Sequence, residues 1–230
     1  MGTSHLTMVV LDGQTRVAQY GQWDGYPKGQ GSTVLDFLAH MDRPLFEQKL
    51  RAARFITPEE HDAAWKATGA TGDWATQEQA AKFHAQYPAQ SRDHGAEVLH
   101  LICQSPDGIV LADSSSFAGD SLFCEWAYVI DLDKNVLEMY RGFNKNKDAD
   151  TGRFKDCGFE PYKAAGGELY YAVELVKTYP LDALPTVEQL CDDGMTEEER
   201  EEHRKEVAAE EAAKAEAETA APDTQPVETK

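Results

Sequence analysis

The sequence predicts an α+β fold with a mostly antiparallel sheet. Two stretches, residues 5–20 and 122–140, hold β-branched and aromatic residues around a short turn and predict β-hairpins. A third stretch at about 168–177 is rich in Tyr and Val and predicts a C-terminal strand. Helix start signals are concentrated between about 32 and 103, so we expect several helices there, packed against the sheet.

The first hairpin rests on a preferred turn dipeptide, Asp12-Gly13, between two apolar segments. The turn of the second is Asp133-Lys134-Asn135. In the strand before that turn, side chains alternate between the two faces of the sheet. The alternation predicts one face with Cys124, Trp126, Tyr128 and Ile130, and the other with Phe123, Glu125, Ala127, Val129 and Asp131.

The expected helices begin at residues that cap helix N-termini, namely Ser32, Asp42, Thr57 and Thr76. The last two are followed three residues later by Glu60 and Gln79, which completes a capping box in each case. Residues 93–103 fit a buried strand or a helix. Their alanine, glutamate and leucine residues favour a helix.

The domain organisation follows from a change in composition. We expect a single α+β domain over residues 1–190 and an acidic, Ala/Glu-rich tail over 191–230 that is helical or disordered. From Cys191 onward the chain has 14 acidic and 5 basic side chains, and the preceding part has 27 and 17. Both parts are therefore acidic.

The net charge of −19 argues against direct nucleic-acid binding, which needs clustered Lys and Arg. The sequence has neither a long apolar run nor a basic, apolar leader, so we expect no membrane span and a cytoplasmic protein. The four cysteines are scattered, which is typical of buried free thiols in a reducing compartment, although Cys124 as a nucleophile is an alternative. We expect no cofactor and no metal, and the oligomeric state is left open.

The first candidate site is the stretch of residues 19–31, rich in glycine and aromatic residues. Its glycine and lysine spacing matches neither a Walker loop nor a dinucleotide fingerprint. Aromatic rings combine a flat apolar face with a polar tip, so Tyr20, Trp23 and Tyr26 are expected to stack on a ligand. Asp24 would accept a hydrogen bond from the ligand, and Lys28 would bind an anionic group. In the alternative reading, Trp23 fills the core and Asp24 caps a turn.

The second candidate site is catalytic. A glutamate within a strand, such as Glu125, becomes a general acid if its face of the sheet is buried, and Asp24 is the other acid/base candidate. If that face is solvated, Glu125 is an ordinary sheet carboxylate. His5, His94 and His100 could meet at a metal, but their spacing forms no metal motif.

The segment Gln19-Tyr-Gly-Gln-Trp-Asp-Gly-Tyr-Pro-x-Gly-Gln-Gly31, together with Phe123–Leu132, resembles a family of uncharacterised bacterial and bacteriophage proteins with this signature. The resemblance covers the body to about residue 180 and implies no activity. The opening hairpin also resembles, at the level of the fold, that of N-terminal nucleophile hydrolases. The nucleophile of that group is not matched, because Gly2 and not Cys, Ser or Thr follows the initiator methionine.

These patterns predict a soluble binding protein, phage-encoded as the family resemblance implies. It would recognise a small polar or nucleotide-like ligand, or a host protein, through residues 19–31. One alternative is a hydrolase that uses Glu125 or Asp24. The other is an acidic interaction protein that inhibits a nucleic-acid-binding partner.

Overall fold

The computed structural model describes residues 2–71 and 75–220. It divides the chain into two compact units, Met1–Gly194 and Met195–Lys230. The described part of the second unit contains one long helix, α7 (Glu197–Ala220).

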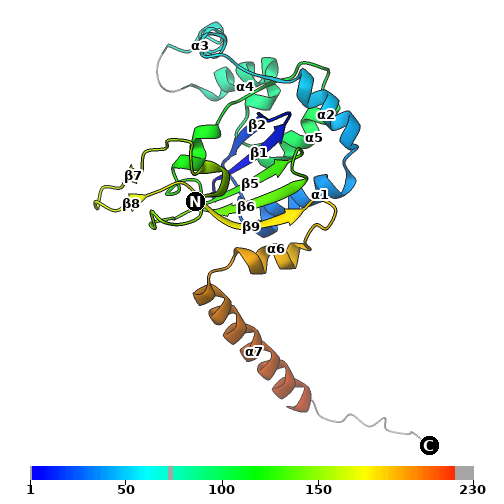
Figure 1. Ribbon diagram of the computed structural model, residues 1–230, viewed down its shortest axis with the longest axis vertical. Coiled ribbons are helices and arrows are strands. Elements are labelled where there is room, and N and C mark those ends of the chain that lie inside the picture. The colour runs from blue at the N-terminus through cyan, green and yellow to red at the C-terminus, as the bar shows by residue number, and fades with distance from the viewer. Residues whose placement is uncertain (1, 72–74, 221–230) are drawn as a thin grey trace, which may run out of the picture. The chain divides into compact units, whose positions relative to one another are not determined.

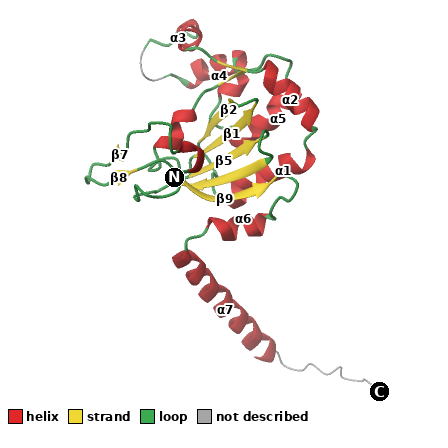
Figure 2. Cartoon of the chain, viewed as in Figure 1, coloured by secondary structure: helices red, strands yellow, loops and turns green. Residues whose placement is uncertain are grey.

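The first unit is built on a five-stranded sheet with helices α1 to α6 around it (Figures 1 and 2). Its helices are α1 (Ser32–His40), α2 (Arg43–Ala52), α3 (Pro58–Ala67), α4 (Gln77–Gln86), α5 (Val98–Gln104) and α6 (Val187–Gly194). Its strands are β1 (His5–Leu11), β2 (Gln14–Gly21), β3 (Arg54–Phe55), β4 (Val110–Leu111), β5 (Trp126–Asp131), β6 (Val136–Arg141), β7 (Tyr162–Lys163), β8 (Leu169–Tyr170) and β9 (Glu174–Pro180). The predicted α+β class is confirmed.

The main sheet has the strand order β2-β1-β5-β6-β9. Both predicted hairpins are present, and all neighbouring strands are antiparallel except β1 and β5, which run parallel. This pairing brings the two hairpin turns together, and the Asp133 carboxylate accepts hydrogen bonds from the backbone N–H groups of Asp12 and Gly13 at 2.9 and 2.7 Å. Asp12 and Gly13 both have positive φ, as a tight two-residue hairpin turn requires.

Each face of the sheet buries an apolar cluster. One cluster contains Val9, Tyr128 and Ile130 of the sheet with side chains of α1, α2, α5 and α6. The other contains Leu6, Ala127 and Val129 with side chains from loops between residues 117 and 173. The predicted alternation therefore holds from Trp126 onward.

The prediction for Cys124 is wrong, because it lies in the cluster with Leu6 and Ala127 and not on the face of Tyr128. Strand β5 begins only at Trp126, and residues 121–123 form a turn in which the backbone N–H groups of Phe123 and Cys124 donate to the Asp120 carbonyl. The period of two does not apply across that turn.

The last predicted strand is divided. Residues 169–170 pair with 162–163 as the small β7–β8 sheet, and β9 of the main sheet begins at Glu174. The chain between them leaves the sheet, since Tyr171 N–H donates to the Asn144 carbonyl and Val173 N–H to the Ala118 carbonyl.

Most helix starts agree with the caps expected from the sequence. Asp42 accepts a hydrogen bond from Leu45 N–H at 3.1 Å, and the capping boxes at Thr57 and Thr76 are both complete. Residues 98–104 are helical as favoured. Ser32 does not cap α1. A π-helical turn over Pro27–Gly31 leads directly into this helix, and the Ser32 hydroxyl donates to the Gly29 carbonyl at 2.6 Å.

Candidate functional site

The 19–31 stretch is held to the sheet by backbone hydrogen bonds. Tyr128, buried on β5, donates its hydroxyl to the Gly25 carbonyl at 2.9 Å. Gly25 N–H donates to the Thr3 carbonyl at 2.9 Å, and Gln30 N–H donates to the Asp24 carbonyl at 2.8 Å. Hydrogen bonds to Thr3 and Tyr128, and one within the loop itself, therefore fix the backbone of this loop.

His5 explains why several of the glycines are needed. Its imidazole is fully buried, and a Cβ built on Gly21 would lie 2.0 Å from His5 Cε1. A Cβ on Gly25 would lie 2.8 Å from His5 Cβ, and one on Gly95 2.9 Å from His5 Cε1. Only a residue without a side chain allows so close an approach. Burial without a charged partner lowers the pKa of His5 from 6.5 to about 4.

The loop carries two partly exposed aromatic side chains, and each of them contacts a carboxylate. Trp23 is 50% exposed and donates its indole N–H to Asp93 Oδ1 at 3.2 Å. Tyr26 is 42% exposed, and its hydroxyl makes a long contact of 3.4 Å with Asp24 Oδ1. We call these four residues the aromatic–acidic surface. Trp23 does not fill the core, which was one reading of the sequence.

The other predicted residues of the loop lie among different partners. The Tyr20 ring packs edge-on against Phe117, with 4.9 Å between centroids, and its hydroxyl donates to Gln22 Oε1 at 2.6 Å. Lys28 is exposed and lies close enough to α6 to interact electrostatically with Glu188. The structure therefore pairs Trp23 with Asp93 and Tyr26 with Asp24, and it gives Tyr20 and Lys28 other partners.

Glu125 connects the sheet to the start of the chain. Its Oε1 accepts a hydrogen bond from Ser4 N–H at 3.2 Å, and its own N–H donates to the Ser4 carbonyl at 3.1 Å. Asp24, the other acid/base candidate, makes no hydrogen bond with Ser4 among the contacts of the described residues. The hydrolase hypothesis for Glu125 or Asp24 stays a prediction.

The other side chains considered for catalysis or metal binding are Cys124, His94 and His100, and each has a structural contact. Cys124 is buried, its thiol donates to the Trp126 carbonyl at 3.4 Å, and burial raises the pKa of the thiol. His94 Nε2 lies 2.8 Å from the Pro88 carbonyl oxygen, and His100 packs edge-on against Phe37. Over residues 2–71 and 75–220, no group of three or more His, Cys, Asp or Glu side chains is arranged to hold a metal ion.

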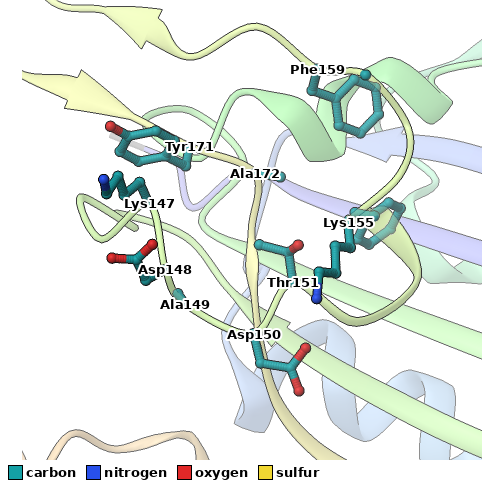
Figure 3. Close-up of a pocket in the computed structure, with 11 residues that line it drawn as sticks. Lys147, Asp148, Ala149, Asp150, Thr151, Lys155, Phe159, Tyr171 and Ala172 are labelled. Atoms are coloured by element: carbon teal, nitrogen blue, oxygen red, sulfur yellow. The ribbon is translucent and has the colours of Figure 1, made fainter.

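The structure also reveals a cavity that we did not predict. It has a volume of about 620 Å³ and is lined by residues of the 147–159 loop and by Tyr171 and Ala172 (Figure 3). Three smaller cavities, of about 250, 380 and 460 Å³, lie elsewhere. None of these four cavities is lined by a residue of 19–31 or by Glu125. In the sequence, the one local signal over residues 144–156 is a repeated Asn/Asp and Lys pattern, which matches no motif of known chemistry.

Comparison with known proteins adds no assignment, because no protein-family model, no curated protein and no solved structure matches the chain. The resemblance of residues 19–31 to a bacterial and bacteriophage family stays a prediction. Within the described residues, no helix has both the length and the apolar character needed to span a membrane.

Proposed function

We propose that this protein binds a partner protein that presents a basic side chain, and that it does so through the aromatic–acidic surface. One observation carries the proposal. Two partly exposed aromatic rings each contact a carboxylate, Trp23 with Asp93 and Tyr26 with Asp24, on a loop with a fixed backbone. A rigid loop loses little conformational freedom when a partner binds.

A protein partner fits this surface better than a small molecule. Small-molecule sites are concave and enclose most of the ligand, whereas Trp23 and Tyr26 are about half exposed and line none of the four cavities described above. Tryptophan and tyrosine are enriched at protein interfaces, where their rings supply contact area and their polar tips keep a hydrogen bond.

The charge distribution favours a basic group on that partner. An arginine guanidinium stacks on an aromatic face and pairs with a carboxylate, and the aromatic–acidic surface offers both. A nucleotide phosphate would instead be repelled by Asp24 and Asp93. The net charge of −19 also attracts a basic partner over a distance.

Isothermal titration with a peptide of alternating glycine and arginine tests the proposal, with the glycine–glutamate peptide as the negative control. Trp23→Ala leaves the net charge unchanged, so any loss of affinity reports the aromatic contact. We expect a loss of about threefold to fivefold, as for a cation on an exposed ring. Tyr162→Ala is the matched control, because Tyr162 is a 38% exposed aromatic residue on the β7–β8 hairpin.

Equal affinities of the wild type, Trp23→Ala and Tyr162→Ala would mean that net charge alone attracts the peptide, and the proposal would fail. Asp24→Asn and Asp93→Asn should each weaken binding, and more so at low ionic strength, because an exposed charge pair is screened by salt.

A further inference from the structure

The 620 Å³ cavity has walls that hydrogen bonds hold in place. Tyr171 N–H donates to the Asn144 carbonyl at 2.9 Å, and the buried Asn144 side chain donates to the Ala172 carbonyl at 2.9 Å. Farther along, Leu175 N–H donates to the Asp150 carbonyl at 2.7 Å. Hydrogen bonds therefore join the loop to the segment after Tyr170 at two places, at Asn144 and at Asp150.

A buried ion-pair network anchors the same loop to the sheet. The Arg153 guanidinium lies 2.6 Å from Asp131 Oδ2 and 2.6 Å from Glu138 Oε2, and all three side chains are largely shielded from solvent. The Tyr140 hydroxyl donates to Glu138 Oε2 at 2.7 Å. Arg153 lies between Thr151 and Lys155, which both line the cavity, so the network fixes the position of the cavity wall.

Charged side chains of both signs line this cavity. Figure 3 shows Lys147 and Asp148 on the same side as Tyr171, and Asp150 and Lys155 nearer Thr151. Neither lysine has an ion pair among the described residues, whereas the neighbouring Lys145 contacts Glu168 at 2.6 Å. Asp150 uses Oδ1 to accept a hydrogen bond from Gly152 N–H at 2.9 Å, and among the described residues no lysine or arginine forms an ion pair with its carboxylate.

The charge balance selects a class of ligand. An anion would pair with the lysines but would also face two carboxylates, and a cation would pair with the carboxylates but face two ammonium groups. A molecule with one group of each sign forms favourable pairs with both sets. We propose that this cavity binds a zwitterionic small molecule of the amino-acid type. The lysines would bind its carboxylate, and Asp148 and Asp150 its ammonium group.

The apolar part of the cavity suits the side chain of such a ligand. Phe159 and Tyr171 are half-buried and line the cavity together with the buried Phe154 and Ala172. Phe159 is packed closely against Gly119, where an added Cβ would come within 2.6 Å of its ring. The volume lies within the range of about 300–1,000 Å³ that is usual for small-ligand sites.

Three probes that share a phenyl ring separate the charge requirements. L-Phenylalanine carries both charges, 2-phenylethylamine only the ammonium group and 3-phenylpropionate only the carboxylate. In isothermal titration of the full chain, we expect L-phenylalanine to bind about fivefold more tightly than either analogue, the contribution of one partly exposed charge pair. Asp148→Asn/Asp150→Asn should remove the advantage of L-phenylalanine over 3-phenylpropionate, and Lys147→Gln/Lys155→Gln should remove its advantage over 2-phenylethylamine.

Lys163→Gln, an exposed lysine of β7 outside the cavity, is the matched control and should bind all three probes as the wild type does. Thermal unfolding of each variant checks that the fold is kept. Equal affinities of the three probes for the wild type would overturn the proposal. So would the absence of binding by every one of the twenty standard amino acids at about 10 mM, a concentration that detects affinities weaker than usual for specific sites.

Discussion

The burial of His5 has a measurable consequence for acid stability. The pKa of His5 is lowered from 6.5 to about 4 by burial, while in the unfolded chain the imidazole keeps its ordinary value. Between pH 6.5 and pH 4 the unfolded chain therefore binds more protons than the folded chain. Acidification through this window favours unfolding, and His5→Gln removes the group that titrates.

The size of the effect follows from the two pKa values. Relative to neutral pH, protonation of His5 should lower the free energy of unfolding by about 2 kcal/mol at pH 5 and about 3 kcal/mol at pH 4. The loss approaches its limit below pH 4, where the histidine is protonated in both states. These free energies need no reduction for screening by solvent, because the His5 side chain is fully buried.

Urea unfolding of the wild type, His5→Gln and His40→Gln at pH 7, 5 and 4 measures this loss. His5→Gln can be less stable than the wild type at pH 7, so the informative quantity is the change in unfolding free energy with pH. His40 is the matched control because its side chain is 74% exposed on α1. Protonation of carboxylates lowers the stability of all three proteins alike, and the difference between them isolates His5.

The reasoning would be refuted if His5→Gln lost as much stability between pH 7 and pH 4 as the wild type. An NMR titration offers an independent check. A His5 Cε1–H resonance that titrates near 6.5 would mean that water or a charged partner reaches the ring.

Three further substitutions test the packing by urea unfolding. Gly21→Ala should destabilise the fold by about 2 kcal/mol, since the added methyl group overlaps the His5 ring, whereas Gly166→Ala, with open space around it, should change stability by less than about 0.5 kcal/mol. Arg153→Ala leaves the buried Glu138 carboxylate without its cation, and leaves Asp131 with only the exposed Lys134 at 3.7 Å. It should lower stability by about 3–5 kcal/mol, against less than about 1 kcal/mol for the exposed Arg51→Ala. Tyr128→Phe leaves the Gly25 carbonyl without its donor and should lower stability by about 1–2 kcal/mol. Equal losses within either matched pair, or no loss for Tyr128→Phe, would contradict these assignments.

Local sequence patterns predict the elements whose structure depends on near neighbours. Asp12-Gly13 identifies the first hairpin because both residues tolerate positive φ. The capping boxes at Thr57 and Thr76 identify α3 and α4 because each is closed within four residues. The parallel pairing of β1 with β5 could not be predicted in this way, since its two strands are more than a hundred residues apart.

For the candidate sites too, the sequence predicts local features but not contacts between distant segments. The composition of residues 19–31 indicates an unusual loop, but not that Tyr20 contacts Phe117 while Trp23 contacts Asp93. These contacts depend on segments that meet only in the folded chain. The same holds for the 620 Å³ cavity, whose two walls are joined through Asn144.

The packing role of the 19–31 loop and its proposed binding role involve different residues. His5 approaches Gly21 and Gly25 so closely that both positions require glycine. The side of the loop that faces His5 therefore has a packing role. That packing, with the Tyr128 hydrogen bond, fixes the backbone that carries Trp23 and Tyr26. A ring held on a fixed backbone loses less entropy on binding than a ring on a mobile loop. The structural role of the glycines therefore supports the proposed binding role of the aromatic rings, and the two can be separated by substituting Trp23, which leaves the contacts of His5 with the glycines unchanged.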